Sequence, residues 1–242
     1  MTVTFDKIAR EPAYRRVSHV IEEKILTRRL LPGNTLPTEM ELAKQFGVNR
    51  STVREGLRQL ENAGLIERRD GGKRLIVTRP RTKDIAAGVS RAMAMHDVTF
   101  LDVWETMMAL EPEATRLAAT RIAPVQLNAL EALVRASETR IDDDQNVVEQ
   151  TVLFFNGLAA ATGNQVLMMS QKPLSLLLRP SLGLMIGRVA QARRRIIDAQ
   201  KEILKALQKG DADLAAEWMR KHILDFRRGY DLAGIDFNHV IA

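Results

Sequence analysis

The chain contains no cysteine. It therefore has no disulfide framework, no thiolate metal site and no cysteine nucleophile. It also lacks the run of roughly 20 apolar residues that a membrane helix needs, and its first residues, MTVTFDKIAREP, lack the apolar segment of a secretion signal. With 242 residues, 45% of them apolar, the chain can bury one large core or two modest ones. We expect a globular, cytoplasmic protein with no membrane contact.

Motifs typical of enzymes are missing as well. The chain has no Gly-x-Ser-x-Gly turn, no phosphate-binding loop and no dinucleotide fingerprint. Its histidines show neither metal-ligand nor catalytic-triad spacing; they are His19, His96, His222 and His239. The aspartates at 142–144 are more typical of a cap on the helix that follows them. We predict that the chain is not an enzyme.

Charge is divided unevenly along the chain. The net charge of +6 is the sum of about +8 in residues 1–83 and about −2 in residues 84–242. A basic first third joined to a near-neutral remainder is typical of a polyanion-binding module attached to a second domain. A solvated basic face without a partner would have the same charge, so charge alone does not decide.

Residues 36–77 carry the pattern that decides between these two interpretations of the charge. An amphipathic helix is predicted before them, over residues 14–29, and Pro32-Gly33 ends it. Thr38 is then expected to begin a short helix as its N-cap, with Glu41 completing a capping box. Gly47 fits the left-handed position after that helix. Two short helices with a tight turn between them are therefore expected.

A second helix and a hairpin complete the pattern. Asn49 is expected to cap a helix over residues 50–63, and Gly64 to terminate it. Segments 65–69 and 74–77 flank a turn whose aspartate and glycines tolerate the positive φ of a tight hairpin. This order is typical of a winged helix-turn-helix, whose second helix enters the DNA major groove by its N-terminal end.

Candidate DNA contacts follow from this arrangement. Guanidinium groups can bridge guanine acceptors, hydroxyl groups can meet phosphates or base edges, and free N–H groups at a helix start favour phosphate. The candidates are Thr38, Arg50, Ser51, Thr52, Arg54 and Arg58 around the helices, and Lys73 in the wing.

The run LPGNTLPTEMELAKQFGVNRSTVREGLRQLENAGLIERRDGGK closely resembles the DNA-binding domain of the GntR family of bacterial transcription regulators. The resemblance places DNA contacts on Arg50, Thr52 and Arg54, and on Gly71 or Gly72 of the wing. The family's usual LPSER is here LPTEM, so Met40 replaces an arginine that often contacts DNA. We expect the binding mode to persist and the preferred operator to differ.

Beyond a short linker at 79–83, every local signal predicts helix. Long stretches are rich in Ala, Leu, Met, Arg and Glu, and glycine and proline occur at few points. Pro112 is expected to kink its helix rather than end it. The expected helices are 82–95, 99–121, 124–140, 143–162, 164–179, 181–209 and 211–229. The fold class predicted is mainly α, with a winged helix-turn-helix domain over residues 1–78 and an all-α bundle over residues 84–242.

This second region resembles the FadR-like, FCD-type ligand-binding domain of the same family. The segments LEPEATRLAA, FFNGLAAATGN and DAQKEILKALQKGDADLAAEWMRKHI carry the resemblance. In metal-binding members, the positions of Val152, Asn156, Gln200 and His222 hold an Asp-x-x-x-His pair and two further histidines. Spacing also brings these four together, because 152 and 156 share a helix face and 200 and 222 are equidistant from Asp211. Val152 has no donor atom and the amides are weak ligands, so we expect no metal and no other cofactor, and a hydrogen-bonded pocket or core histidine at 222.

The expected effector follows from the same substitutions. Members that bind small carboxylates commonly carry an arginine where this chain has Met107 and Met108, and a guanidinium is the group best suited to a carboxylate. Thioethers suit irregular apolar ligands. We hypothesise an effector larger and more apolar than a simple hydroxy acid, aromatic or acyl in character. An equally good interpretation is that these methionines are ordinary core residues.

Two functions from different classes remain after the enzyme is set aside. The first is a ligand-responsive regulator of the repressor type; the resemblance implies a homodimer that binds a short palindromic operator in double-stranded DNA. The second is an effector-independent or architectural DNA-binding protein with a degenerate pocket. Either would work in the cytoplasm, associated with the nucleoid.

Overall fold

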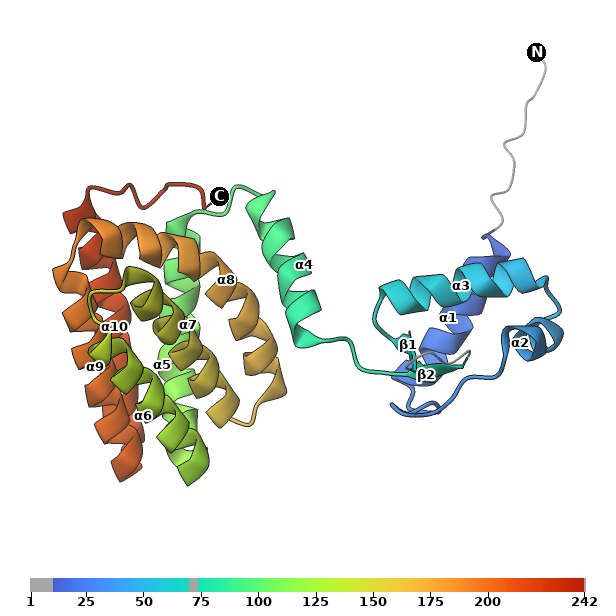
Figure 1. Ribbon diagram of the computed structural model, residues 1–242, viewed down its shortest axis with the longest axis horizontal. Coiled ribbons are helices and arrows are strands. Elements are labelled where there is room, and N and C mark those ends of the chain that lie inside the picture. Colours follow the sequence, from blue (N-terminus) through green and yellow to red (C-terminus); the bar gives the residue numbers. More distant parts are fainter. Residues whose placement is uncertain (1–10, 70–73, 242) are drawn as a thin grey trace, which may run out of the picture. The chain divides into compact units, whose positions relative to one another are not determined.

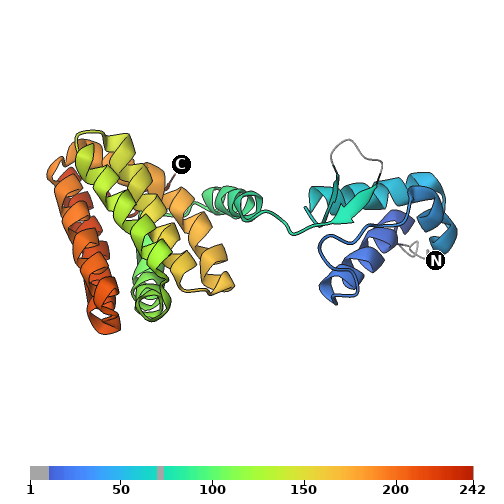
Figure 2. The same ribbon diagram turned by 60° about the horizontal axis from the view of Figure 1, so that its bottom comes forward.

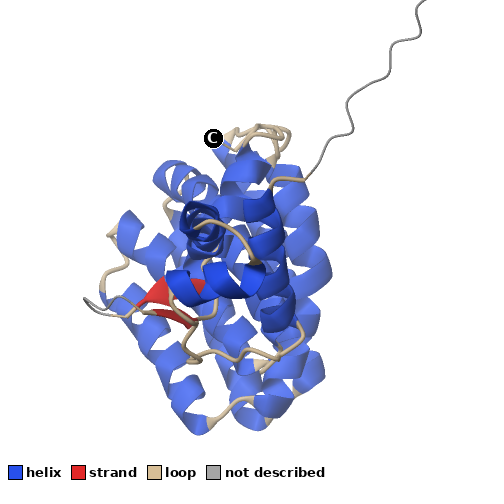
Figure 3. Cartoon of the chain, turned by 90° about the vertical axis from the view of Figure 1, so that its right-hand side faces the viewer, coloured by secondary structure: helices blue, strands red, loops and turns tan. Residues whose placement is uncertain are grey.

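In the computed structural model, which describes residues 11–69 and 74–241, the chain divides into two compact units. One extends to Arg81 and the other begins at Thr82. Helices dominate both, and among the described residues the named strands form one two-stranded sheet (Figure 3). The mainly α fold, a winged helix-turn-helix followed by an all-α bundle, is confirmed. None of the described helices is both long and apolar enough to cross a membrane.

The first unit contains three helices and a hairpin (Figure 1). In order, these are α1 (Ala13–Leu26), α2 (Glu39–Phe46), α3 (Arg50–Asn62), β1 (Ile66–Arg68) and β2 (Leu75–Val77). The core is the apolar stripe of each helix closed by the inward residues of the hairpin, with Val53, Leu57 and Ile66 almost wholly buried. This stripe follows from apolar residues spaced three and four apart. The core therefore fixes which face of α3 remains exposed.

Close contacts between α1 and α3 set the position of that face. Gly56 lies against α1, since a Cβ atom there would be 2.8 Å from the carbonyl oxygen of Tyr14. The hydroxyl group of Ser18 on α1 donates to the side-chain carbonyl of Gln59 on α3, at 3.0 Å. These contacts hold α3 at short range on α1.

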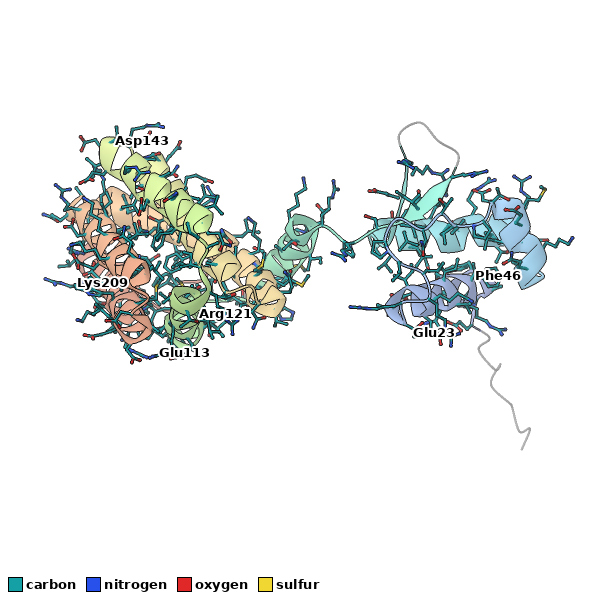
Figure 4. The ribbon with its side chains drawn as sticks, turned by 90° about the horizontal axis from the view of Figure 1, so that it is seen from below. Glu23, Phe46, Glu113, Arg121, Asp143 and Lys209 are labelled. Atoms are coloured by element: carbon teal, nitrogen blue, oxygen red, sulfur yellow. The ribbon has the colours of Figure 1, made fainter. Side chains whose placement is uncertain are left out.

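The second unit is a bundle of seven helices within the described range (Figures 1 and 2). They are α4 (Thr82–Ala94), α5 (Phe100–Arg121), α6 (Pro124–Thr139), α7 (Asp144–Ala161), α8 (Gln165–Arg188), α9 (Gln191–Lys209) and α10 (Ala212–Ala233). One apolar cluster runs through α5 to α10. Figure 4 shows this unit from below, with side chains in the space between its helices.

The predicted break at Pro180 is wrong. Helix α8 continues through both Pro173 and Pro180 as far as Arg188, and α9 begins only at Gln191. A proline inside a helix costs about 3 kcal/mol because it removes a hydrogen bond and crowds the preceding turn. Here α8 buries a long apolar face, including Leu174, Leu178 and Leu182, and that burial outweighs the local cost.

The C-terminal tail closes one end of the bundle. After α10 the chain turns at Gly234, where φ is +63°, and pairs with the connection between α4 and α5. At the start of α5, Leu101 donates its N–H to the Phe237 carbonyl at 2.9 Å, and Phe100 donates its N–H to the His239 carbonyl at 3.1 Å. Figure 1 shows the tail beside that connection. The tail thus supplies part of the cap of α5.

Candidate DNA-binding surface and bundle interior

Helix α3 presents a cationic face to solvent. The side chains of Arg50, Arg54 and Arg58 are 63%, 51% and 65% exposed. They are spaced four residues apart, and successive pairs of that spacing share a helix face. The opposite face carries the buried residues Val53 and Leu57. The amphipathic pattern therefore leaves all three guanidinium groups on the solvent side.

The N-terminal ends of α2 and α3 differ in their capping. Thr38 and Glu41 form the predicted capping box, with the Glu41 N–H donating to the Thr38 hydroxyl at 3.3 Å and the Thr38 N–H to the Glu41 carboxylate at 2.7 Å. Gly47 has a φ of +64°, as predicted. Asn49 occupies the N-cap position of α3, but its side chain makes no capping hydrogen bond, so that part of the prediction is wrong. The start of α3 therefore keeps N–H groups free of a side-chain cap.

The remaining predicted contacts lie around this helix start. Ser51 is exposed and Thr52 is half-buried, both in the first turn of α3. The hydroxyl group of Thr38 also donates to Glu41, so it is engaged within its own cap. Met40, which stands where the family often has arginine, is 65% exposed.

Glu39 is a residue of this surface that sequence reasoning did not single out. Its carboxylate accepts hydrogen bonds from Nε and Nη2 of Arg54, the latter at 2.9 Å, and lies 4.0 Å from Nη2 of Arg50. The hydrogen bond from Arg54 lowers the pKa of Glu39 below its ordinary value. No local pattern in the sequence reveals this pairing, because it depends on how α2 packs on α3.

The wing is a true antiparallel hairpin. Ile66 pairs with Val77 and Arg68 with Leu75. A further segment extends it, because Leu36 donates its N–H to the Leu75 carbonyl at 2.8 Å and Thr35 bridges Ile76. The predicted wing contacts Gly71, Gly72 and Lys73 lie outside the described residues.

Two of the predicted pocket residues on α7 contact each other and α8. Val152 is buried, and the Asn156 side-chain N–H donates to its carbonyl at 2.8 Å. The side-chain oxygen of Asn156 accepts from the hydroxyl group of Ser175 at 3.2 Å. On α5, Met107 is buried and Met108 is half-buried against the core. Their position supports the interpretation of these methionines as core residues.

Gln200 and His222 lie deeper, on α9 and α10. Both side chains are buried, and an ion pair of Arg195 with Asp225, at 2.8 Å, joins the same two helices. The His222 ring stacks on Phe155, with 5.7 Å between ring centroids. Burial lowers the pKa of His222 to about 3, so its imidazole is neutral at physiological pH.

The interior of the bundle is more polar than the sequence suggested. Gln200 and the Nε2 atom of His222 have no hydrogen-bond partner among the described protein groups, and neither do the hydroxyl groups of Thr115 and Thr151. Burial raises the pKa of Glu111, near Gln171, to about 8, so this carboxyl group is mostly protonated at pH 7. Buried polar groups are normally paired, and these neutral groups offer hydrogen bonds without charge.

The four aligned positions do not fit a metal of the type that the resemblance implies. Val152 offers no donor atom, and both polar atoms of the Asn156 amide are engaged. Among the residues that the structure describes, no group of three or more His, Asp or Glu side chains could hold a metal ion. A site for a first-row metal needs about three or four good donors.

Taken together, the fold and this surface define a winged helix-turn-helix DNA-binding domain joined to an all-α domain. The family description "Bacterial regulatory proteins, gntR family" matches residues 13–74, and the FCD domain matches residues 102–225. The chain belongs to the GntR family of bacterial regulators, in its FCD-type branch.

Relatives and a solved structure agree with this assignment. The chain is 34% identical over 161 residues to an uncharacterized HTH-type transcriptional regulator from Mycobacterium tuberculosis, covering 65% of each protein. It is 25% identical over 222 residues to the HTH-type transcriptional repressor NanR of Edwardsiella tarda, covering 89% of this chain and 84% of NanR. The solved structure of Streptococcus agalactiae GntR superposes with a TM-score of 0.60 at 26% identity, covering 89% of this chain and 99% of that one. The chain is therefore a DNA-binding transcription regulator and not an enzyme.

Proposed function

We propose that this regulator is a homodimeric, ligand-responsive repressor that binds a short palindromic operator. The observation that carries the proposal is the cationic N-terminal half of α3, where Arg50 and Arg54 are exposed beside uncapped N–H groups. A helix with this character is suited to enter the major groove, and two-fold pairing would present two such helices to a symmetric site.

Each predicted contact has a role in this proposal. Arg50 and Arg54 read base edges, since a guanidinium can donate two hydrogen bonds to guanine. Thr52 joins them at the base edges, and Ser51 and Arg58 contact the phosphate backbone. The cap residue Thr38 orients the start of α2, and the wing tip follows a neighbouring phosphate strand.

The proposed effector enters the interior of the second unit. Val152 and Phe155 supply apolar surface there, while Gln200 and the neutral His222 supply uncharged hydrogen-bonding groups. Such walls suit an aromatic or acyl compound with a neutral polar group, and they offer no guanidinium to a carboxylate. The effector is then larger and more apolar than a simple hydroxy acid.

Binding titrations test the DNA-reading surface. Arg50→Ala and Arg54→Ala should each weaken binding to a duplex enriched by the wild-type protein from a randomised library, by about 1–3 kcal/mol for each lost bidentate contact. Fluorescence anisotropy at fixed salt measures the change. Arg135→Ala, which removes an exposed cation in the second unit, is the control and should leave binding unchanged. Unchanged binding by both α3 variants would refute the assignment of α3 as the helix that reads DNA.

Calorimetry tests the effector. Aromatic and acyl compounds should include micromolar ligands, whereas short hydroxy acids and Zn²⁺ should not bind in that range. Micromolar binding of a hydroxy acid or of Zn²⁺ would contradict the proposed pocket. A ligand that shifts operator affinity would also exclude the alternative of an effector-independent architectural protein.

A further inference from the structure

Glu39 begins α2 and faces α3, the proposed DNA-reading helix. Its carboxylate spans two donors of Arg54, with Nε at 3.3 and 3.2 Å from its two oxygens and Nη2 at 2.9 Å. The Glu39 side chain is only 22% exposed, while that of Arg54 is 51% exposed. The carboxylate is thus the anchored partner, and the arginine is the partner that reaches solvent.

The geometry of the contact determines what Arg54 has left to offer. Glu39 occupies the side of the guanidinium that carries Nε and Nη2. Nη1 and the second hydrogen of Nη2 remain as a planar fork at the tip of the side chain. Such a fork matches the paired acceptors of guanine in the major groove. A held guanidinium also loses less conformational freedom on binding than a free one.

Glu39 has a second, opposite electrostatic effect. Its hydrogen bond with Arg54 lowers its pKa, which keeps the carboxylate charged at neutral pH. A negative charge between Arg50 and Arg54 weakens the general attraction of this surface for phosphates, which supplies most non-specific binding. One residue therefore reduces sequence-independent affinity while it orients a base-reading side chain.

We propose that Glu39 is a positioning and specificity-determining residue, which holds Arg54 side-on so that its tip reads a base while its own charge suppresses non-specific binding. This proposal rests on the proposed function of α3 as the reading helix. It makes discrimination between operator and other DNA, rather than affinity itself, the property that Glu39 controls.

The test compares two duplexes. Wild-type protein and Glu39→Gln are titrated against a duplex enriched by the wild-type protein from a randomised library and against a scrambled duplex of the same composition. Glu39→Gln should bind the scrambled duplex more tightly and the enriched duplex more weakly. The discrimination ratio should fall by about tenfold, within the range for one bidentate base contact. Opposite changes for the two duplexes would not arise from a loss of folding.

Glu55→Gln is the matched control. Glu55 lies on α3, pairs with Arg58 at 3.8 Å and is 51% exposed. Its substitution therefore removes one negative charge from α3 without touching the contact between Glu39 and Arg54. Binding to both duplexes should strengthen by a similar factor and leave the ratio unchanged. In an Arg54→Ala background, Glu39→Gln should no longer alter the ratio, because its effect passes through Arg54.

Glu39→Asp provides a second variant in case Glu39→Gln folds poorly. It keeps the charge and withdraws the carboxylate by one methylene, so the ratio should fall without tighter binding to the scrambled duplex. An unchanged ratio in both variants, or an equal fall in the Arg54→Ala background, would overturn the proposal. If the wild-type protein enriches no duplex over the scrambled one, the proposed operator binding fails instead.

Discussion

Single residues inside the second unit carry opposite responses to pH. His222 has a folded-state pKa of about 3 against an ordinary value of 6.5, so its contribution to stability is lost as pH falls below 6.5. Glu111 has a folded-state pKa of about 8 against an ordinary value of 4.5, so its contribution is lost as pH rises between those values. As pH rises from 6.5 to 8 the effect of His222 fades, because its imidazole becomes neutral in the unfolded state as well, and the effect of Glu111 is the larger of the two.

Glu111→Gln should therefore remove the part of the pH dependence of stability that this carboxyl group causes. The wild-type free energy of unfolding should fall as pH rises from 6.5 to 8, with a slope of at most about 1.4 kcal/mol per pH unit from this group. Urea unfolding followed by tryptophan fluorescence measures it, because both tryptophans, Trp104 and Trp218, lie in the second unit. Glu113→Gln, an exposed carboxylate on the same helix, should keep the wild-type slope. A slope that survives Glu111→Gln would show that Glu111 is not its source.

Among the elements, α1 and α3 depend on a close approach at Gly56. Gly56→Ala should lower the stability of the first unit, because its Cβ would lie 2.8 Å from the backbone oxygen of Tyr14. Overpacking costs about 1–3 kcal/mol, which exceeds the gain of up to about 1 kcal/mol from alanine in a helix. Calorimetric unfolding should show this loss in a transition that tryptophan fluorescence does not follow.

Gly88→Ala in α4 is the control for that substitution. Apart from its chain neighbours and the backbone of its own helix, no described atom lies within 4 Å of a Cβ at Gly88. Helix propensity should therefore act alone, and the second unit should be unchanged or slightly stabilised. Equal effects of the two alanine substitutions would mean that the short contact at Gly56 does not limit packing.

Local chemistry explains why some elements could be predicted and others could not. The cap at Thr38 and the left-handed Gly47 depend on neighbours within a few residues, and both were predicted from them. The continuation of α8 through Pro180 depends on burial against other helices, and Asn49 takes its N-cap position without the expected side-chain bond. The tail that pairs with the α4–α5 connection joins distant segments, which no local pattern reveals.

The whole molecule joins a unit that was largely predictable to one that was less so. The fold class and the exposed arginines of α3 follow from helical periodicity and turn residues. The ion pair of Glu39 with Arg54 and the neutral polar interior around His222 do not, because they arise where packing brings separate helices together. Both are features of tertiary contact, and both bear on how DNA and effector would be recognised.

The central claim is that the start of α3 reads DNA sequence. The most direct measurement is to enrich duplexes from one randomised library with wild-type protein and with Arg54→Ala, and to sequence both pools. The wild-type pool should contain a short palindrome, and the Arg54→Ala pool should lose preference at one symmetric pair of guanines while keeping it elsewhere. An identical palindrome from both proteins would contradict the claim.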